Sequence, residues 1–329
     1  MTSPVRAVDL IMCITPFGEP DARLATAVCA AGGLGVLDLG RGDRRTREAL
    51  ARLRRAAPGP YGVRIAAGCA LTPDDLIADG LAPDRLGPAP DTVVRAADAP
   101  WTVAELAPHT RVLAEVTDLA GARAAVAAGA HGLIARGAES GGLVGELSTF
   151  VLLQQLLSAT ELAVPVWAAG GIGPHTAAAA VAGGAAGVVL DSQLALLAES
   201  RLPEATAAAL RSLDGSETAV VAGYRVLHRR GPDAVRPPAD DPAAVAALLG
   251  AEDLRTQLLP VGQDGFLAAR FAERWGDVRR TVRELTAAIR GNGAAAAADA
   301  LRPTDPAAGA APDTLPTAVQ VAGPAVDAL

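Results

Sequence analysis

The chain is poor in aromatic residues and in cysteine. Aromatic residues make up only 3% of its 329 residues, so a large core has to be built mainly from Ala, Val and Leu. The three cysteines, Cys13, Cys29 and Cys69, are too few for a disulfide framework in a chain of this length and lack the spacing of metal ligands. We therefore expect no bound metal and a reducing compartment, the cytoplasm.

Positive charge and long apolar runs are also scarce. The formal net charge is -7 and the isoelectric point is about 5.2, which argues against nucleic acid as a main partner. The apolar run at the N-terminus is too short for a signal peptide, and the Ala- and Gly-rich stretch 177–190 is too short to span a membrane. The sequence predicts neither a nucleic-acid nor a membrane partner.

Short apolar segments alternate with helical patterns over the first two thirds of the chain. Such alternation is typical of parallel β/α units, and near-continuous apolar strands fit a sheet that is buried on both faces. Eight units favour a closed TIM (β/α)8 barrel over the alternative, a doubly wound open sheet. The predicted strands are residues 8–14, 34–39, 61–66, 91–95, 111–116, 132–135, 164–168 and 187–190.

The pattern changes after about residue 200. Residues 1–200 are the predicted barrel, and residues 201–290 read as a helical extension packed on it, with helices at 201–213 and 241–249 and a long helix or a pair at 266–290. Residues 291–329 are rich in Ala and Pro and read as a flexible linker. Such a linker suggests further domains downstream, and the alternative is an ordinary disordered C-terminus.

Two strands run directly into glycine clusters. The seventh strand ends in Ala168-Ala169-Gly170-Gly171-Ile172-Gly173, just before a helix, where exposed N–H groups and the helix dipole favour an anion. The end of the eighth strand, with Asp191 and Ser192, should lie beside it, because barrel phosphate sites use the loops after these two strands. We expect Gly170, Gly171 and Ser192 to bind a phosphate; the alternative is a tight turn with glycines for geometry.

A second glycine cluster follows the sixth strand. In ESGGLVGE, Gly141 and Gly142 let the loop lie flat against a ligand, and Glu146 is a candidate acid/base group. His175 follows the seventh-strand glycines and could donate to a phosphate or a substrate. The alternatives are a solvent-facing or helix-capping carboxylate and a histidine on a helix surface.

These motifs resemble the nitronate monooxygenase (2-nitropropane dioxygenase-like) family and the flavin-type bacterial enoyl-acyl carrier protein reductases. The resemblance covers roughly residues 8–200. PVGQDGFLAARFA in the extension makes the chain similar to the N-terminal barrel domain of large polyketide or polyunsaturated-type fatty acid synthases. The matching segments are TAVCAAGGLGVLDLG, YGVRI, AAGAHGLIARGAESGGLVGELSTF, VPVWAAGGIG and GGAAGVVLDSQLAL.

The resemblance implies FMN across the C-terminal mouth of the barrel. Its phosphate would lie on Gly170, Gly171 and Ser192, with Gly141 and Gly142 near the ring. It also implies hydride transfer from NAD(P)H, or oxidation of an acidic C–H by the flavin and oxygen. The implied partners are an acyl carrier protein or other synthase domains and a small acyl substrate, and an oligomer is compatible with these features.

The chain departs from the family pattern at four sites. Leu143 stands where the family has its catalytic histidine, and leucine cannot move a proton. Asp191-Ser192 replaces the usual Gly-Thr, which places a carboxylate beside the expected phosphate. Arg64 replaces an asparagine and Arg136 a Gln or Glu. These two arginines could compensate for Asp191 or bind another anion, such as a phosphopantetheine.

Three hypotheses on function follow. The first is an FMN-dependent oxidoreductase domain of a polyketide or fatty acid synthase that reduces an enoyl thioester on an acyl carrier protein. The second is a degenerate, catalytically inactive barrel that acts as a scaffold or docking module, which Leu143 and Asp191 favour. The third is a nitronate monooxygenase.

Overall fold

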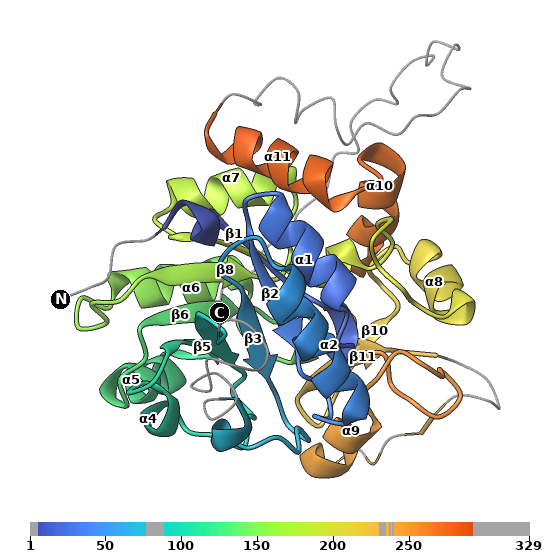
Figure 1. Cartoon of the computed structure of the whole chain (residues 1–329), viewed down its shortest axis with the longest axis horizontal. Helices are drawn as coiled ribbons and strands as arrows, with labels where there is room; N and C mark the ends of the chain where they lie inside the picture. The colour runs from blue at the N-terminus through green and yellow to red at the C-terminus, as the bar shows by residue number, and fades with distance from the viewer. Residues whose placement is uncertain (1–5, 77–88, 230–234, 237, 239, 292–329) are drawn as a thin grey trace, which may run out of the picture.

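The computed structural model describes residues 6–76, 89–229, 235–236, 238 and 240–291. Within these ranges, eight parallel strands close into a barrel surrounded by helices (Figure 1). Their order is β1-β2-β3-β4-β5-β6-β8-β9, and β9 pairs back onto β1. The prediction of a TIM barrel is confirmed. Its strands are β1 (Ile11–Ile14), β2 (Leu34–Asp38), β3 (Gly62–Ile65), β4 (Thr92–Arg95), β5 (Arg111–Val116), β6 (Gly132–Arg136), β8 (Val166–Ala169) and β9 (Gly187–Leu190).

The helices form the outer layer around this barrel. Several of them have an aspartate as N-cap, whose carboxylate accepts free backbone N–H groups of the first turn. Asp21, Asp43 and Asp118 are examples. The helices between strands are α1 (Ala22–Ala30), α2 (Arg44–Ala56), α4 (Val103–Leu106), α5 (Leu119–Ala127), α6 (Thr149–Ser158) and α7 (Pro174–Ala182). None of the described helices is long and apolar enough to cross a membrane.

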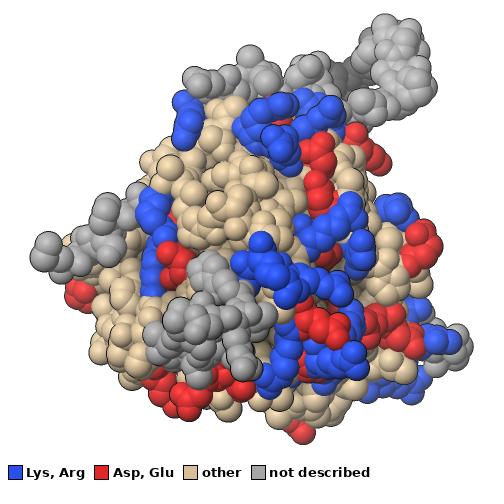
Figure 2. All heavy atoms as spheres, viewed as in Figure 1, with Lys and Arg blue, Asp and Glu red and all other residues tan. Residues whose placement is uncertain are grey.

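Charged side chains are mixed on the face that α1 and α2 present (Figure 2). All of its basic groups are arginines, because the sequence has no lysine. Some of them form exposed ion pairs along one helix, such as Arg44 with Glu48 at 2.8 Å. Such exposed pairs contribute little to stability.

The extension after the barrel contains more than helices. Its helices are α8 (Glu204–Arg211), α9 (Pro242–Leu248), α10 (Leu267–Arg274) and α11 (Val278–Ile289), so the expected 266–290 segment is a pair of helices. Between them lies a β-hairpin, β10 (Thr218–Val221) and β11 (Tyr224–Leu227), which the sequence analysis did not anticipate. Only a short 3-10 turn directly follows β9 in the described chain, and the next helix, α8, belongs to the extension. α11 of the extension packs against α7 and α1 and takes the place of a helix after β9 in the helical layer (Figure 1).

Two further expectations need comment. The first strand begins at Ile11 rather than at residue 8, because residues 7–10 form a 3-10 turn in which Asp9 accepts hydrogen bonds from Arg6. The predicted helix at 72–80 lies partly, and the predicted linker at 291–329 almost wholly, outside the described residues.

Trp167 fills the lower part of the barrel interior. It is fully buried, and its indole N–H donates to the carbonyl oxygen of Asp9 at 2.7 Å. Neighbouring strands make room for the ring with glycine: a Cβ at Gly132 would lie 2.7 Å from a ring carbon, and one at Gly187 would lie 2.9 Å from the indole nitrogen. The Trp167 ring therefore fills interior volume of the barrel in a chain with few aromatic residues.

Candidate functional site

Alternate residues of each strand point into the barrel, and their chemistry changes from apolar to charged at the C-terminal end. Val36, Leu113, Ile134 and Val189 belong to an apolar cluster inside the barrel. Two residues further along each of these chain segments come Asp38, Glu115, Arg136 and Asp191. The mouth of the barrel is therefore floored by a charged layer, to which Arg64 of β3 also belongs.

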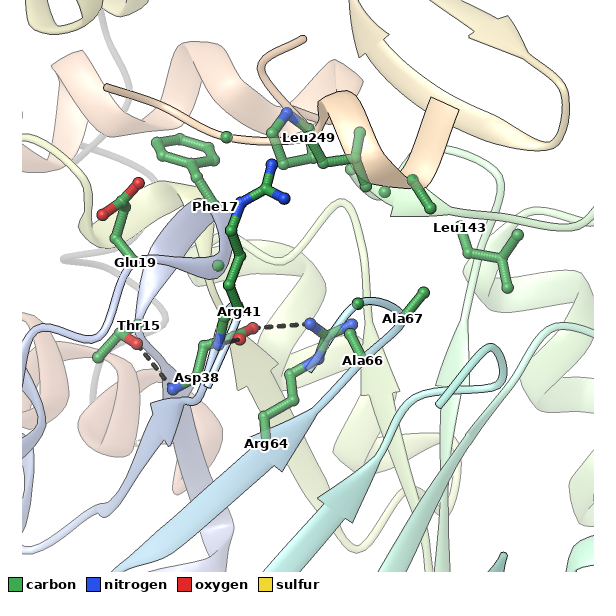
Figure 3. A pocket seen from close by; sticks show the side chains of 18 of the residues that line it. Thr15, Phe17, Glu19, Asp38, Arg41, Arg64, Ala66, Ala67, Leu143 and Leu249 are labelled. Carbon is green, nitrogen blue, oxygen red and sulfur yellow. Dashed lines mark hydrogen bonds and ion pairs between the residues drawn. The ribbon is translucent and has the colours of Figure 1, made fainter. Parts of the chain in front are cut away.

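These charged groups form a continuous chain of ion pairs across the mouth. Arg64 binds Asp38 at 2.7 Å and holds both carboxylate oxygens of Glu115 at 2.8 Å. Arg136 then bridges Glu115 at 3.4 Å and Asp191 at 3.2 Å. Figure 3 shows Asp38 and Arg64 pointing toward one another from neighbouring strand ends.

The ion pairs shift the pKa values of two groups in this layer, Glu115 and Arg64. Burial raises the pKa of Glu115, but the attraction of Arg64 and Arg136 outweighs it and lowers that pKa to about 2. Burial opposes the charge of Arg64, but Glu115 and Asp38 raise its pKa well above the usual value. With three carboxylates against two guanidinium groups, the layer carries one formal negative charge.

A cavity of about 350 Å³ opens above this layer. Thr15, Ala66, Leu143 and Leu249 are among the residues on its walls (Figure 3). Five of the residues that the sequence predicted for cofactor binding line it: Arg64, Arg136, Gly141, Gly142 and Ser192. The other four predicted site residues, Gly170, Gly171, Glu146 and His175, are not among its lining residues. Glu146 and His175 are exposed to solvent.

The hairpin of the extension holds the loop that carries Leu143. The short strand β7 (Gly142–Leu143) pairs with β11, which places Leu143 opposite Tyr224. Leu143 packs against the apolar cluster that contains Tyr224, and the Tyr224 hydroxyl donates to Asp98 at 2.9 Å. The position of the family's histidine is thus part of an apolar contact between the barrel and its extension.

The glycine loop after β8 was predicted to bind an anion. Gly170 and Gly171 have φ values of 100° and 65°, which favour glycine. The N–H of Gly171, however, donates to Oδ2 of Asp264 at 2.9 Å, and the side-chain amide of Gln193 donates to the same oxygen at 2.8 Å. Asp264 comes from η4 (Gln263–Phe266) of the extension.

The loop after β9 is engaged in the same way. Oδ1 of Asp191 accepts the backbone N–H of Ser192 at 2.6 Å and the Ser192 hydroxyl at 3.0 Å. The donors of both loops are therefore already bound to carboxylates of the chain itself. A phosphate dianion placed there would lose these donors and face two acidic side chains. As arranged, the residues do not fit the phosphate of FMN.

Sequence reasoning missed four residues of this site: Asp38, Glu115, Gln193 and Asp264. Asp38 and Glu115 had a signal, because each continues the inward two-residue period of its strand. Gln193 lies next to the predicted Ser192. Asp264 lies in PVGQDGFLAARFA, a segment that the sequence analysis singled out, but nothing there indicated a contact with Gly171, 93 residues earlier in the chain.

Comparison with known proteins agrees with this fold. A family model described as nitronate monooxygenase matches residues 89–231. A FabK variant from Thermotoga maritima is 26% identical, with a TM-score of 0.67 over 88% of this chain and 94% of that one. A nitroalkane oxidase from Streptomyces ansochromogenes is 25% identical, with a TM-score of 0.63 over 86% of this chain and 97% of that one.

The predicted resemblance to the nitronate monooxygenase family is confirmed. The chain thus has a nitronate monooxygenase-type oxidoreductase fold. An enoyl reductase domain of MlnA from the macrolactin cluster of Bacillus amyloliquefaciens shares the fold alone, at 12% identity and a TM-score of 0.61, covering 86% of this chain and 95% of that domain.

Two curated relatives match part of the chain. Both are named (3aS,4S,5R,7aS)-5-hydroxy-7a-methyl-1-oxo-octahydro-1H-indene-4-carboxyl-CoA dehydrogenase. The one from Mycobacterium tuberculosis is 31% identical over 56% of this chain and 52% of its own length. The one from Rhodococcus jostii is 31% identical over 55% of this chain and 50% of its own length. The chain spans about half the length of these curated relatives.

Proposed function

We propose that the chain is a nitronate monooxygenase-type barrel that has lost flavin chemistry and serves as a docking or scaffold domain for acyl thioesters in a polyketide or fatty acid synthase. The observation that carries the proposal is the engagement of both predicted phosphate loops by Asp264 and Asp191. Leu143 supports it, because no proton donor stands at the position of the family's histidine.

The acyl thioester part of the proposal rests on the relatives. The curated dehydrogenases act on a carboxyl-CoA, by their names, and the resemblance stated from sequence is to a reductase of acyl carrier protein substrates. The mouth cavity of about 350 Å³ is large enough for the end of an acyl chain. Synthase domains and an acyl carrier protein are the partners we propose, in the cytoplasm.

A second candidate is an FMN-dependent enoyl reductase that uses NAD(P)H. The similarity to FabK favours it, because it covers nearly the whole of both chains at 26% identity. FMN would supply the hydride chemistry, and Arg64, Arg136, Gly141 and Gly142 would have to face its ring. Nitronate oxidation shares this need for flavin and is further disfavoured by Leu143.

A visible absorption spectrum decides between these candidates. The purified chain is mixed with FMN, desalted and scanned, and crotonyl-CoA binding is measured by calorimetry on the same sample. We expect no retained flavin band but measurable thioester binding. A stoichiometric flavin band that NAD(P)H bleaches would replace the proposal with the second candidate, and absence of thioester binding would remove the acyl part.

A further inference from the structure

Asp264 is a buried acidic side chain that the extension places against the loops after β8 and β9. Its side chain is only 3% exposed, and Oδ2 accepts from Gly171 and Gln193 while Oδ1 has no hydrogen-bond partner among the described residues. The segment that carries it is pinned to the barrel, because the N–H of Gln263 donates to the Glu139 carbonyl oxygen at 2.8 Å. A group held this way occupies a fixed place.

Four hydrogen-bond donors, of the kinds that bind phosphates, are engaged by the two acidic side chains. They are the N–H of Gly171, the amide of Gln193, and the N–H and hydroxyl of Ser192. They lie beside the N-terminus of α7, a nine-residue helix that adds a favourable dipole for an anion. Backbone and side-chain donors of this kind bind a phosphate monoester when no internal acceptor competes.

We infer that Asp264 and Asp191 are internal stand-ins for the phosphate of a ligand, so that the phosphate subsite keeps its donors but is closed from within. The inference rests on the proposed function and gives it a physical cause. Asp264 accepts the hydrogen bond of Gly171 in the loop after β8, and Asp191 accepts that of Ser192 in the loop after β9. Removing both side chains should therefore expose a site for a phosphate monoester.

Both substitutions are needed, because each acidic side chain alone still occupies its own donors. In Asp191→Gly the Ser192 donors are freed, but Asp264 remains on Gly171. In Asp264→Ala the β8 donors are freed, but Asp191 remains on Ser192. The double variant Asp191→Gly/Asp264→Ala removes both acidic acceptors from these donors, while the Gln193 amide keeps its hydrogen bond to the Ile172 carbonyl oxygen at 3.2 Å. The matched control, Asp191→Asn/Asp264→Asn, removes the charges but keeps the side-chain volume.

The test measures binding of FMN, riboflavin and inorganic phosphate to the full chain. Riboflavin lacks the phosphate, so the difference between FMN and riboflavin affinity gives the contribution of the phosphate apart from that of the flavin ring. Binding of inorganic phosphate reports on the phosphate subsite alone. We expect the opened double variant to bind FMN at least about tenfold more tightly than riboflavin. We also expect phosphate to raise its melting temperature, with smaller effects in the Asn control and none in the unaltered chain.

A folded double variant that does not distinguish FMN from riboflavin and does not respond to phosphate would overturn the inference. If this variant fails to fold, as circular dichroism would show, the Asn control decides: no phosphate response there also overturns it. Neither result touches the proposed function, which the unaltered chain tests. Flavin retained by the unaltered chain would instead overturn the proposed function itself.

Discussion

Arg64 and Glu115 join two non-adjacent strands of the barrel through a double hydrogen bond, Nε to Oε1 and Nη2 to Oε2, each at 2.8 Å. The planar guanidinium matches the carboxylate at both atoms, which makes this the strongest kind of ion pair. Because β4 lies between β3 and β5, the pair ties the barrel across its mouth rather than along one ladder. The same Glu115 also receives Arg136.

Removing Glu115 should destabilise the barrel strongly. Glu115→Ala leaves two buried arginines short of a partner, and breaking such buried pairs costs about 3–5 kcal/mol. Urea unfolding followed by circular dichroism measures the free energy of unfolding. The control is Glu161→Ala, which removes an exposed pair with Arg123 and should leave the urea midpoint nearly unchanged. Equal losses in the two variants would contradict a structural role for the network.

Asp264 should make stability fall as pH rises from about 4 to 7. Burial and repulsion by Asp191 raise its pKa from 3.8 to about 7, so in this range the folded chain binds more protons than the unfolded chain. The contribution of protonated Asp264 to the free energy of unfolding is fully present below pH 3.8 and is lost as the pH rises through 7. Asp264→Asn removes this dependence and should stabilise the chain by on the order of 3 kcal/mol at pH 8 but little at pH 4.

The measurement for Asp264 is the difference in unfolding free energy between Asp264→Asn and the unaltered chain at several pH values. Using the difference cancels the titration of groups that both proteins share. A pH-independent difference would contradict the raised pKa. Asp277→Asn is the control, a carboxylate-to-amide change outside the site, at the N-cap of α11, where Asp277 accepts the N–H of Arg280.

Trp167 should be the most sensitive apolar position of the barrel interior. Trp167→Ala leaves a cavity among Gly132, Gly187 and their neighbours and should cost about 3–5 kcal/mol. Trp167→Phe keeps most of the side-chain volume, so its packing loss is smaller. It also removes the hydrogen bond to the Asp9 carbonyl oxygen, which should lower the free energy of unfolding by about 1 kcal/mol more. Phe150, which is 42% exposed, serves as the control, because Phe150→Ala should be nearly neutral.

The strands were predictable because their burial on both faces leaves uninterrupted apolar runs, as at Ile11–Ile14 and Gly187–Leu190. The hairpin was missed because its turn lacks the usual signal: Ala222 and Gly223 both have positive φ, a conformation normally marked by Asn-Gly or Asp-Gly. In the site, the glycine loops were predictable, but the carboxylate that binds Gly171 comes from a distant segment. Only the packing of the extension brings Asp264 there.

Leu143→His tests whether the lost proton donor or the closed phosphate subsite limits the chemistry. On its own, this substitution should give no NAD(P)H-dependent reduction of crotonyl-CoA, because the donors on Gly171 and Ser192 stay bound to carboxylates. In the Asp191→Gly/Asp264→Ala background, with FMN added, it should raise turnover by about 100-fold or more over the Leu143 form.

Nicotinamide oxidation followed by absorbance gives the rates for all four combinations. Leu143→Phe in both backgrounds is the control, since it changes the same apolar contact with the hairpin without adding a proton donor. Turnover in the Leu143→His single variant would show that the subsite is open in the unaltered chain. Equal turnover of the His and Phe forms in the opened background would mean that position 143 does not carry the proton, and the loss of function would then rest on the closed subsite alone.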